Sequence, residues 1–66
     1  MANRTLADCH ILVVEDEYML ADDLRDELES AGAIVLGPAS DVASALALLA
    51  VEPQIDGAIL DINLAG

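Results

Sequence analysis

Two apolar stretches of this sequence end in carboxylates. Residues 10–14 run into Glu15 and Asp16, and residues 57–60 run into Asp61. In a parallel α/β sheet, the carboxyl ends of neighbouring strands lie at one edge, and ligands bind beyond that edge. If the two stretches are neighbouring strands, their three carboxylates converge on one point.

Converging carboxylates have a limited chemistry. Two such charges about 5 Å apart repel by roughly 3 kcal/mol at an effective dielectric constant of about 20. The repulsion is relieved when one group takes up a proton, which raises its pKa, or when a hard divalent cation binds among the oxygens. Mg²⁺ suits such a site because it accepts carboxylate and carbonyl oxygens and keeps several waters, which leaves room for a phosphoryl oxygen.

A carboxylate beside such a cation can itself attack phosphorus and form an aspartyl phosphate. Asp61 stands alone at the end of its strand and is the candidate nucleophile. Glu15 and Asp16 are adjacent and form a candidate metal-holding pair.

Each acid also has a purely structural alternative. Asp16 could cap a following helix, with Glu15 and Glu17 favouring the helix dipole. Asp61 could be a turn residue whose side chain bonds the backbone near Asn63. The conjunction of acids at two strand ends favours a functional site, because turn residues need not occur at such paired positions.

The elements that must position these acids follow from the spacing of the apolar residues. Residues 10–14 predict a central strand, because they are apolar at nearly every position. Leucines at every fourth position then predict a helix that opens at Asp16 or Glu17 and ends at Gly32. These leucines are Leu20, Leu24 and Leu28.

The second half of the chain repeats this alternation. Residues 33–36 predict a short strand that Gly37 and Pro38 stop. A second helix follows, with Ser40 as its N-cap, and Pro53 ends it. Asp41 lies in its positive first turn, and its expected buried stripe consists of Val42, Leu46 and Leu49.

The third strand ends at Asp61, so the predicted order is β-α-β-α-β. Right-handed crossovers turn this order into an α/β fold, a parallel sheet with helices on both faces.

Charge excludes several kinds of partner. The formal net charge is −11, with thirteen acids, two arginines and no lysine. We therefore expect no direct contact with nucleic acid or anionic membranes. One cysteine and one histidine, Cys9 and His10, are too few ligands for a zinc site. No apolar run approaches membrane-spanning length, so we expect a soluble cytoplasmic protein.

The two acidic motifs resemble those of the bacterial response-regulator receiver domain. They are ILVVEDE at residues 11–17 and AILDINL at residues 58–64. The resemblance covers the whole chain, including the intervening helices and turns. It implies a partial receiver (REC) domain over residues 1–66, with a truncated flavodoxin-like (CheY-like) fold that stops after the phospho-acceptor strand.

The resemblance also implies residue roles in a two-component phosphorelay. Asp61 would accept a phosphoryl group from a histidine kinase or phosphotransfer protein, so the domain is a phosphoprotein of signal transduction and not an enzyme. Asp16 would bind Mg²⁺ directly, Glu15 would reach it through water, and the main-chain carbonyl of Asn63 would complete the metal shell.

The family's later features are not in this sequence: a Ser or Thr after the fourth strand, an aromatic switch residue and a lysine that pairs with the phosphoryl group. We therefore expect the chain alone to bind Mg²⁺ weakly and not to switch. A third strand with an open outer edge also predicts self-association.

Two other classes of function are alternatives. One is an interaction or dimerisation module that works without phosphorylation. The other is a phosphatase of the haloacid dehalogenase type, because residues 61–63 superficially resemble its Asp-x-Asp signature. Asn63 argues against the phosphatase, since a neutral amide cannot serve as its general acid or base.

Overall fold

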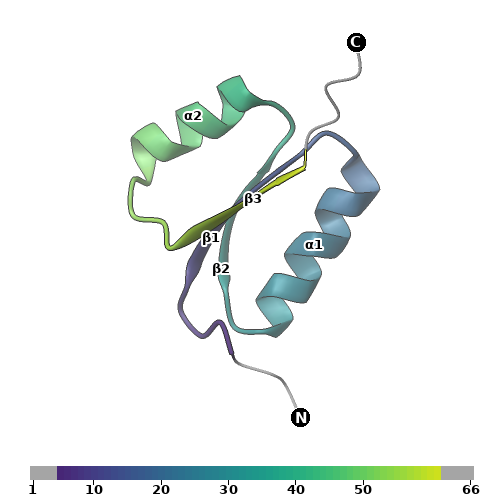
Figure 1. The fold of residues 1–66 in the computed structure, drawn as a ribbon, viewed down its shortest axis with the longest axis vertical. Helices are drawn as coiled ribbons and strands as arrows, with labels where there is room; N and C mark the ends of the chain where they lie inside the picture. Colours follow the sequence, from purple (N-terminus) through teal and green to yellow (C-terminus); the bar gives the residue numbers. More distant parts are fainter. Residues whose placement is uncertain (1–4, 62–66) are drawn as a thin grey trace.

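The computed structural model of this chain describes residues 5–61 and contains five elements (Figure 1). Their order is β1 (His10–Glu15), α1 (Tyr18–Ser30), β2 (Ile34–Ala39), α2 (Val42–Val51) and β3 (Gly57–Asp61). The predicted β-α-β-α-β order and the α/β class are therefore confirmed.

The three strands form one parallel sheet in the order β2-β1-β3. β1 is the central strand, which explains why its sequence is apolar at almost every position. α1 and α2 lie on opposite sides of the sheet (Figure 1), because the crossover from β1 to β2 and the crossover from β2 to β3 run in opposite directions along the sheet. The helices thus cover both faces of β1 and β2.

The core is built on the alternating side chains of β1. Val13 and Val14 are both fully buried, at 0% exposure, and successive side chains of a strand point to opposite faces. Leu12 and Val14 belong to the cluster beneath α2, together with Leu36, Ala39 and Ala45. Val13 therefore faces α1, and this alternation decides the direction of Glu15 as well.

β2 extends farther than its sequence predicts. The strand continues through Gly37 and Pro38 to Ala39, so the prediction that these two residues stop it was wrong. In the pairing of β1 with β2, Leu12 is opposite Leu36 but Val14 is opposite Ala39. β2 therefore has one extra residue at this point, which is a β-bulge. β2 is an edge strand, and an edge bulge tolerates a proline that has no N–H to donate.

The helix ends agree with prediction in α1 and differ in α2. Glu17 is the N-cap of α1, and Gly32 follows its C-cap with a φ of +97°, as expected of a terminating glycine. In α2 the N-cap is Asp41 and not Ser40, because β2 runs on to Ala39 and the helix begins later. The Asp41 carboxylate accepts a hydrogen bond of 2.7 Å from the Ser44 N–H.

The predicted buried stripe of α2 is largely wrong. Val42 is 57% exposed and Leu46 is 61% exposed, whereas Ala45 is buried and Leu49 is partly buried. α2 packs on β1 and β2, and its Cα atoms lie more than 8 Å from those of β3, so the side chains on that flank of α2 are only partly covered within the described part of the chain. Neither described helix is long and apolar enough to cross a membrane.

Gly37 allows a direct test of the bulge. It has a φ of +95°, and an added Cβ would lie 2.7 Å from the Ala39 nitrogen and 3.0 Å from the Val13 oxygen. We expect Gly37→Ala to lower the free energy of unfolding by about 1–3 kcal/mol, measured by urea denaturation.

Gly57→Ala is the matched control, because its Cβ would meet only the Ile11 Cδ1 at 3.5 Å, an ordinary contact. It should change the free energy of unfolding by less than about 0.5 kcal/mol. Equal stabilities of the two variants would contradict the close backbone approach at Gly37.

Candidate functional site

The sheet brings the two acidic strand ends together. β1 and β3 are parallel neighbours, and their register places Glu15 directly opposite Asp61. Adjacent strands lie about 4.8 Å apart, so the two carboxylates start from neighbouring positions on one face. The predicted convergence of Glu15 and Asp61 is thus a property of the strand pairing.

Glu15 is a buried acid, with only 4% of its surface exposed. It lies two residues after Val13 and therefore points to the same face, toward α1. Its Oε1 accepts a hydrogen bond of 3.0 Å from the Glu17 N–H. Its Oε2 is buried and has no hydrogen-bond partner among the described residues, which is costly for a carboxylate.

The surroundings of Glu15 act on its pKa in opposite directions. The hydrogen bond from the Glu17 N–H is the largest single influence and lowers the pKa. Burial, the side chain and charge of Asp61, and the side chain of Asp16 together outweigh it, so the pKa of Glu15 lies above its usual 4.5. Both neighbouring acids are therefore close enough to interact with Glu15.

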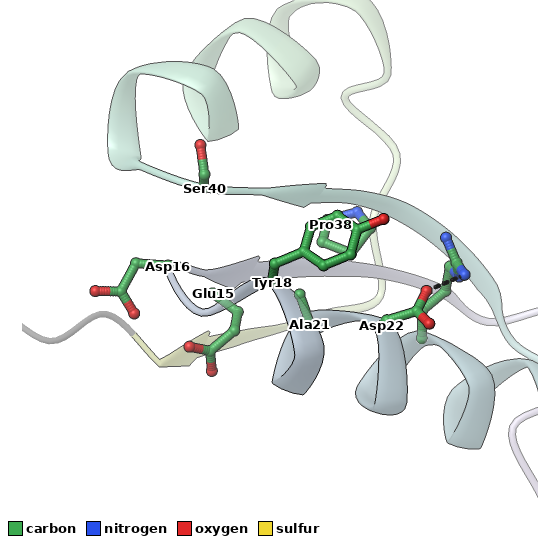
Figure 2. Close-up of a pocket in the computed structure, with 8 residues that line it drawn as sticks. Glu15, Asp16, Tyr18, Ala21, Asp22, Pro38 and Ser40 are labelled. Atoms are coloured by element: carbon green, nitrogen blue, oxygen red, sulfur yellow. Dashed lines mark hydrogen bonds and ion pairs between the residues drawn. The ribbon is translucent and has the colours of Figure 1, made fainter.

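Asp16 occupies the outer rim of the site. Its side chain is exposed, and Figure 2 shows the carboxylates of Glu15 and Asp16 at the same end of β1, pointing away from Tyr18 and Pro38. The alternative in which Asp16 caps α1 is wrong, because Glu17 holds the N-cap position. Asp16 therefore remains a candidate for the metal-holding role.

The predicted metal ligands are only partly assembled. Glu15 and Asp61 are paired, with Asp16 beside them, but residues 5–61 contain no group of three His, Cys, Asp or Glu side chains placed to hold a metal ion. Asn63 lies outside the described residues, as does the turn in which its backbone would pair with Asp61. The unpartnered Oε2 and the oxygen donors nevertheless fit the chemistry of a hard cation.

A cavity of about 160 Å³ adjoins the acids on the α1 face (Figure 2). Its lining residues are Glu15, Asp16, Tyr18, Ala21, Asp22, Arg25, Pro38 and Ser40. The sequence pattern did not predict this cavity. Arg25 is a half-exposed member of its wall and pairs with Asp22, and its nitrogen is 3.7 Å from Asp26. The spacing of three residues between Asp22 and Arg25 was the available signal for the ion pair.

No family model, no curated protein and no solved structure matches this chain.

Glu15 predicts an unusual dependence of stability on pH. A folded-state pKa above the unfolded value means that the stabilising contribution of Glu15 is fully present below the unfolded pKa and is lost as the pH rises through the folded pKa. We expect Glu15→Gln to be more stable than the wild type at pH 7, and the difference in free energy of unfolding between them to shrink as the pH falls toward 4.5. Urea midpoints measured with EDTA across this range test the prediction.

Asp41→Ala is the control of opposite sign. The hydrogen bond from the Ser44 N–H lowers the pKa of Asp41 in the folded state. The stabilising contribution of Asp41 is therefore present above pH 3.8, the usual pKa of the group, and is lost as the pH falls through the folded pKa. This variant should be less stable than the wild type at pH 7. A gap between Glu15→Gln and the wild type that does not depend on pH would show that Glu15 has no raised pKa.

Proposed function

We propose that this chain carries the phospho-accepting site of a receiver domain in two-component signalling, with Asp61 as the acceptor. The pairing of Glu15 with Asp61, at the carboxyl ends of parallel neighbouring strands, is the observation that carries the proposal. The order β2-β1-β3 agrees with the first three strands of a flavodoxin-like (CheY-like) sheet.

The proposal includes Mg²⁺ as a cofactor. The residues that would hold it are Glu15, Asp16 and Asp61, with the main-chain carbonyl of Asn63. Support comes from the buried Glu15 Oε2, which has no hydrogen-bond partner among the described residues and which a cation would satisfy. When bound, Mg²⁺ supplies positive charge that offsets the repulsion between these carboxylates and an incoming phosphoryl group.

Asp61 supplies the nucleophile. Its side chain is exposed at the end of β3, where the phosphohistidine of a histidine kinase or phosphotransfer protein can approach. A carboxylate oxygen of Asp61 forms a bond to phosphorus while the P–N bond breaks, and the electron pair of that bond returns to the imidazole. The chain accepts the group once and is not itself an enzyme.

Labelling with acetyl phosphate tests the acceptor. With Mg²⁺ present we expect a mass increase of one phosphoryl group, which EDTA suppresses and Asp61→Asn abolishes. Asp56→Asn is the matched control, because Asp56 is the exposed acid that precedes β3 at its other end, and it should label as the wild type does. Undiminished labelling of Asp61→Asn would refute the assignment, and so would failure of the wild type to label.

Phosphorylation of Asp61 should not change the conformation of the chain away from the site. The 66 residues contain no lysine that could pair with the phosphoryl group. We therefore propose that this chain by itself binds Mg²⁺ weakly and undergoes no reversible conformational switch when labelled.

An interaction module is the second candidate function, and the edge of β3 favours it. Among the described strands β3 pairs with β1 alone, so its other edge presents unpaired N–H and C=O groups. Such an edge can pair with the same edge of a second copy, against the repulsion between chains of net charge −11.

Sedimentation velocity tests self-association through this edge. We expect the sedimentation coefficient to rise with protein concentration, and to rise more at high salt because salt screens the repulsion between chains. Asp61→Ala should associate as the wild type does, since the pairing uses backbone groups. A compact monomer at every concentration and salt level would rule out the edge as an interface.

A further inference from the structure

The two strands that carry the acids are joined at their other ends by a pair of hydrogen bonds. Asp56 immediately precedes β3, and His10 is the first residue of β1. The His10 N–H donates a hydrogen bond of 2.8 Å to the Asp56 Oδ2, and the Asp56 N–H donates one of 2.7 Å to the His10 carbonyl. The two residues thus bind each other reciprocally, although they are 46 positions apart in the sequence.

In this contact a side chain takes the place of a backbone acceptor. The paired register of β1 and β3 begins one residue later, with Ile11 opposite Gly57. Within a parallel ladder, each N–H that faces the neighbouring strand donates to a backbone carbonyl of that strand. The His10 N–H donates to a carboxylate oxygen instead, and a charged acceptor makes the stronger hydrogen bond. The Asp56 carboxylate therefore extends the ladder beyond the start of β3.

The Asp56 side chain differs in reach from the other hydrogen-bonded acids. The bonds accepted by the side chains of Glu15, Asp22 and Asp41 come from residues only two or three positions away. Those bonds organise a helix or a turn, whereas the bond between His10 and Asp56 joins two strands. It is therefore placed to influence how β3 aligns with β1.

β3 depends on β1 for its alignment. The Cα atoms of both described helices lie more than 8 Å from those of β3. Ile55, just before Asp56, packs against the apolar cluster beneath α2, but apolar contact is non-directional and does not by itself specify a register. A hydrogen bond between one named donor and one named acceptor is directional, so it favours a single alignment.

The alignment at this end determines the geometry at the other. β3 has five residues, and its last residue, Asp61, lies opposite Glu15. A slip of one residue would turn every side chain of β3 to the other face and remove the Asp61 carboxylate from Glu15.

We propose that Asp56 is a positioning residue, whose Oδ2, bound to the His10 N–H, sets the register of β3 on β1 and so places Asp61 opposite Glu15. The acceptor oxygen supplies this effect. The His10 imidazole is not required for it, because its Nδ1 lies 3.7 Å from the same oxygen, beyond hydrogen-bond length. Only the consequence for phosphorylation rests on the proposed function.

NMR of three variants tests the register without any phosphoryl donor. Asp56→Ala removes the acceptor, and Asp56→Asn keeps one, because its amide oxygen can accept the same N–H. Glu52→Ala is the matched control, since Glu52 is an exposed acid in the same connection between α2 and β3.

In Asp56→Ala we expect amide-exchange protection of β3 to fall at least about threefold relative to that of β2, and the backbone NOEs between Val14 and Leu60 to weaken. Asp56→Asn and Glu52→Ala should retain both signals. If Asp56→Ala loses its helical circular dichroism, the wild type decides, because its His10 amide should exchange more slowly than that of an unstructured peptide.

Acetyl-phosphate labelling measures the functional consequence. Asp56→Ala should label at least about threefold more slowly than the wild type, and Asp56→Asn and Glu52→Ala at the wild-type rate. A wild type that does not label would refute the proposed function, and the NMR measurements would still decide the role of Asp56.

Four results would overturn the positioning role. Unchanged β3 protection and NOEs in Asp56→Ala would show that the register does not need the acceptor. An equal fall in the protection of β2 and β3 would show a general loss of stability. Failure of Asp56→Asn to restore the signals would show that the acceptor oxygen is not the cause. An unprotected His10 amide in the wild type would show that the hydrogen bond does not form.

Discussion

The pairing of β1 with β3 is the constraint on which the proposed chemistry depends. The last four residues of β1 are buried, and the final one is Glu15. A buried carboxylate is unfavourable, and the in-register position of Asp61 adds a second negative charge beside it. One backbone N–H satisfies one oxygen of Glu15 and leaves the other unpartnered within the described residues. The fold thus places an unfavourable buried charge and a repulsive pair of carboxylates at one edge of the sheet. Ionisable groups perturbed in this way concentrate at functional sites.

The alternation of β1 separates two surfaces of different character. Val13 and Glu15 face α1, where the acids and the neighbouring cavity lie. Leu12 and Val14 face α2, where an apolar groove opens toward β3. Because both surfaces depend on the same central strand, a change in the register of β1 would exchange the side chains of the two faces and destroy both.

Much of this arrangement can be predicted from local sequence, and the rest depends on contacts between distant elements. The strand ends at Glu15 and Asp61 follow from apolar runs, and the stop at Gly32 follows from glycine chemistry. The continuation of β2 through Pro38 does not follow from local sequence. A proline is tolerated there because β2 lies at the edge of the sheet, and that position depends on the pairing of distant strands. With β2 longer, the N-cap passes from Ser40 to Asp41, two residues of similar capping ability.

Burial is the property that the sequence predicted least well. Leu46 is apolar and correctly spaced, yet it is exposed because α2 packs on β1 and β2 and its Cα atoms lie more than 8 Å from those of β3. Glu15 belongs to an acidic run that is typical of a solvated helix start, yet it is buried because its neighbours along the sheet come from another part of the chain. In both cases spacing along the chain specifies a face of an element, and only the packing of a second element decides whether that face is covered.

The central claim is that Glu15 and Asp61 meet as interacting carboxylates, and NMR titration of the Glu15 side-chain carboxyl carbon tests it most directly. In the wild-type chain without divalent cations, the pKa of Glu15 should lie above 4.5, and Asp61→Asn should lower it toward that value because it removes the neighbouring charge. A Glu15 pKa at or below 4.5, or one that Asp61→Asn leaves unchanged, would contradict the convergence of the two acids.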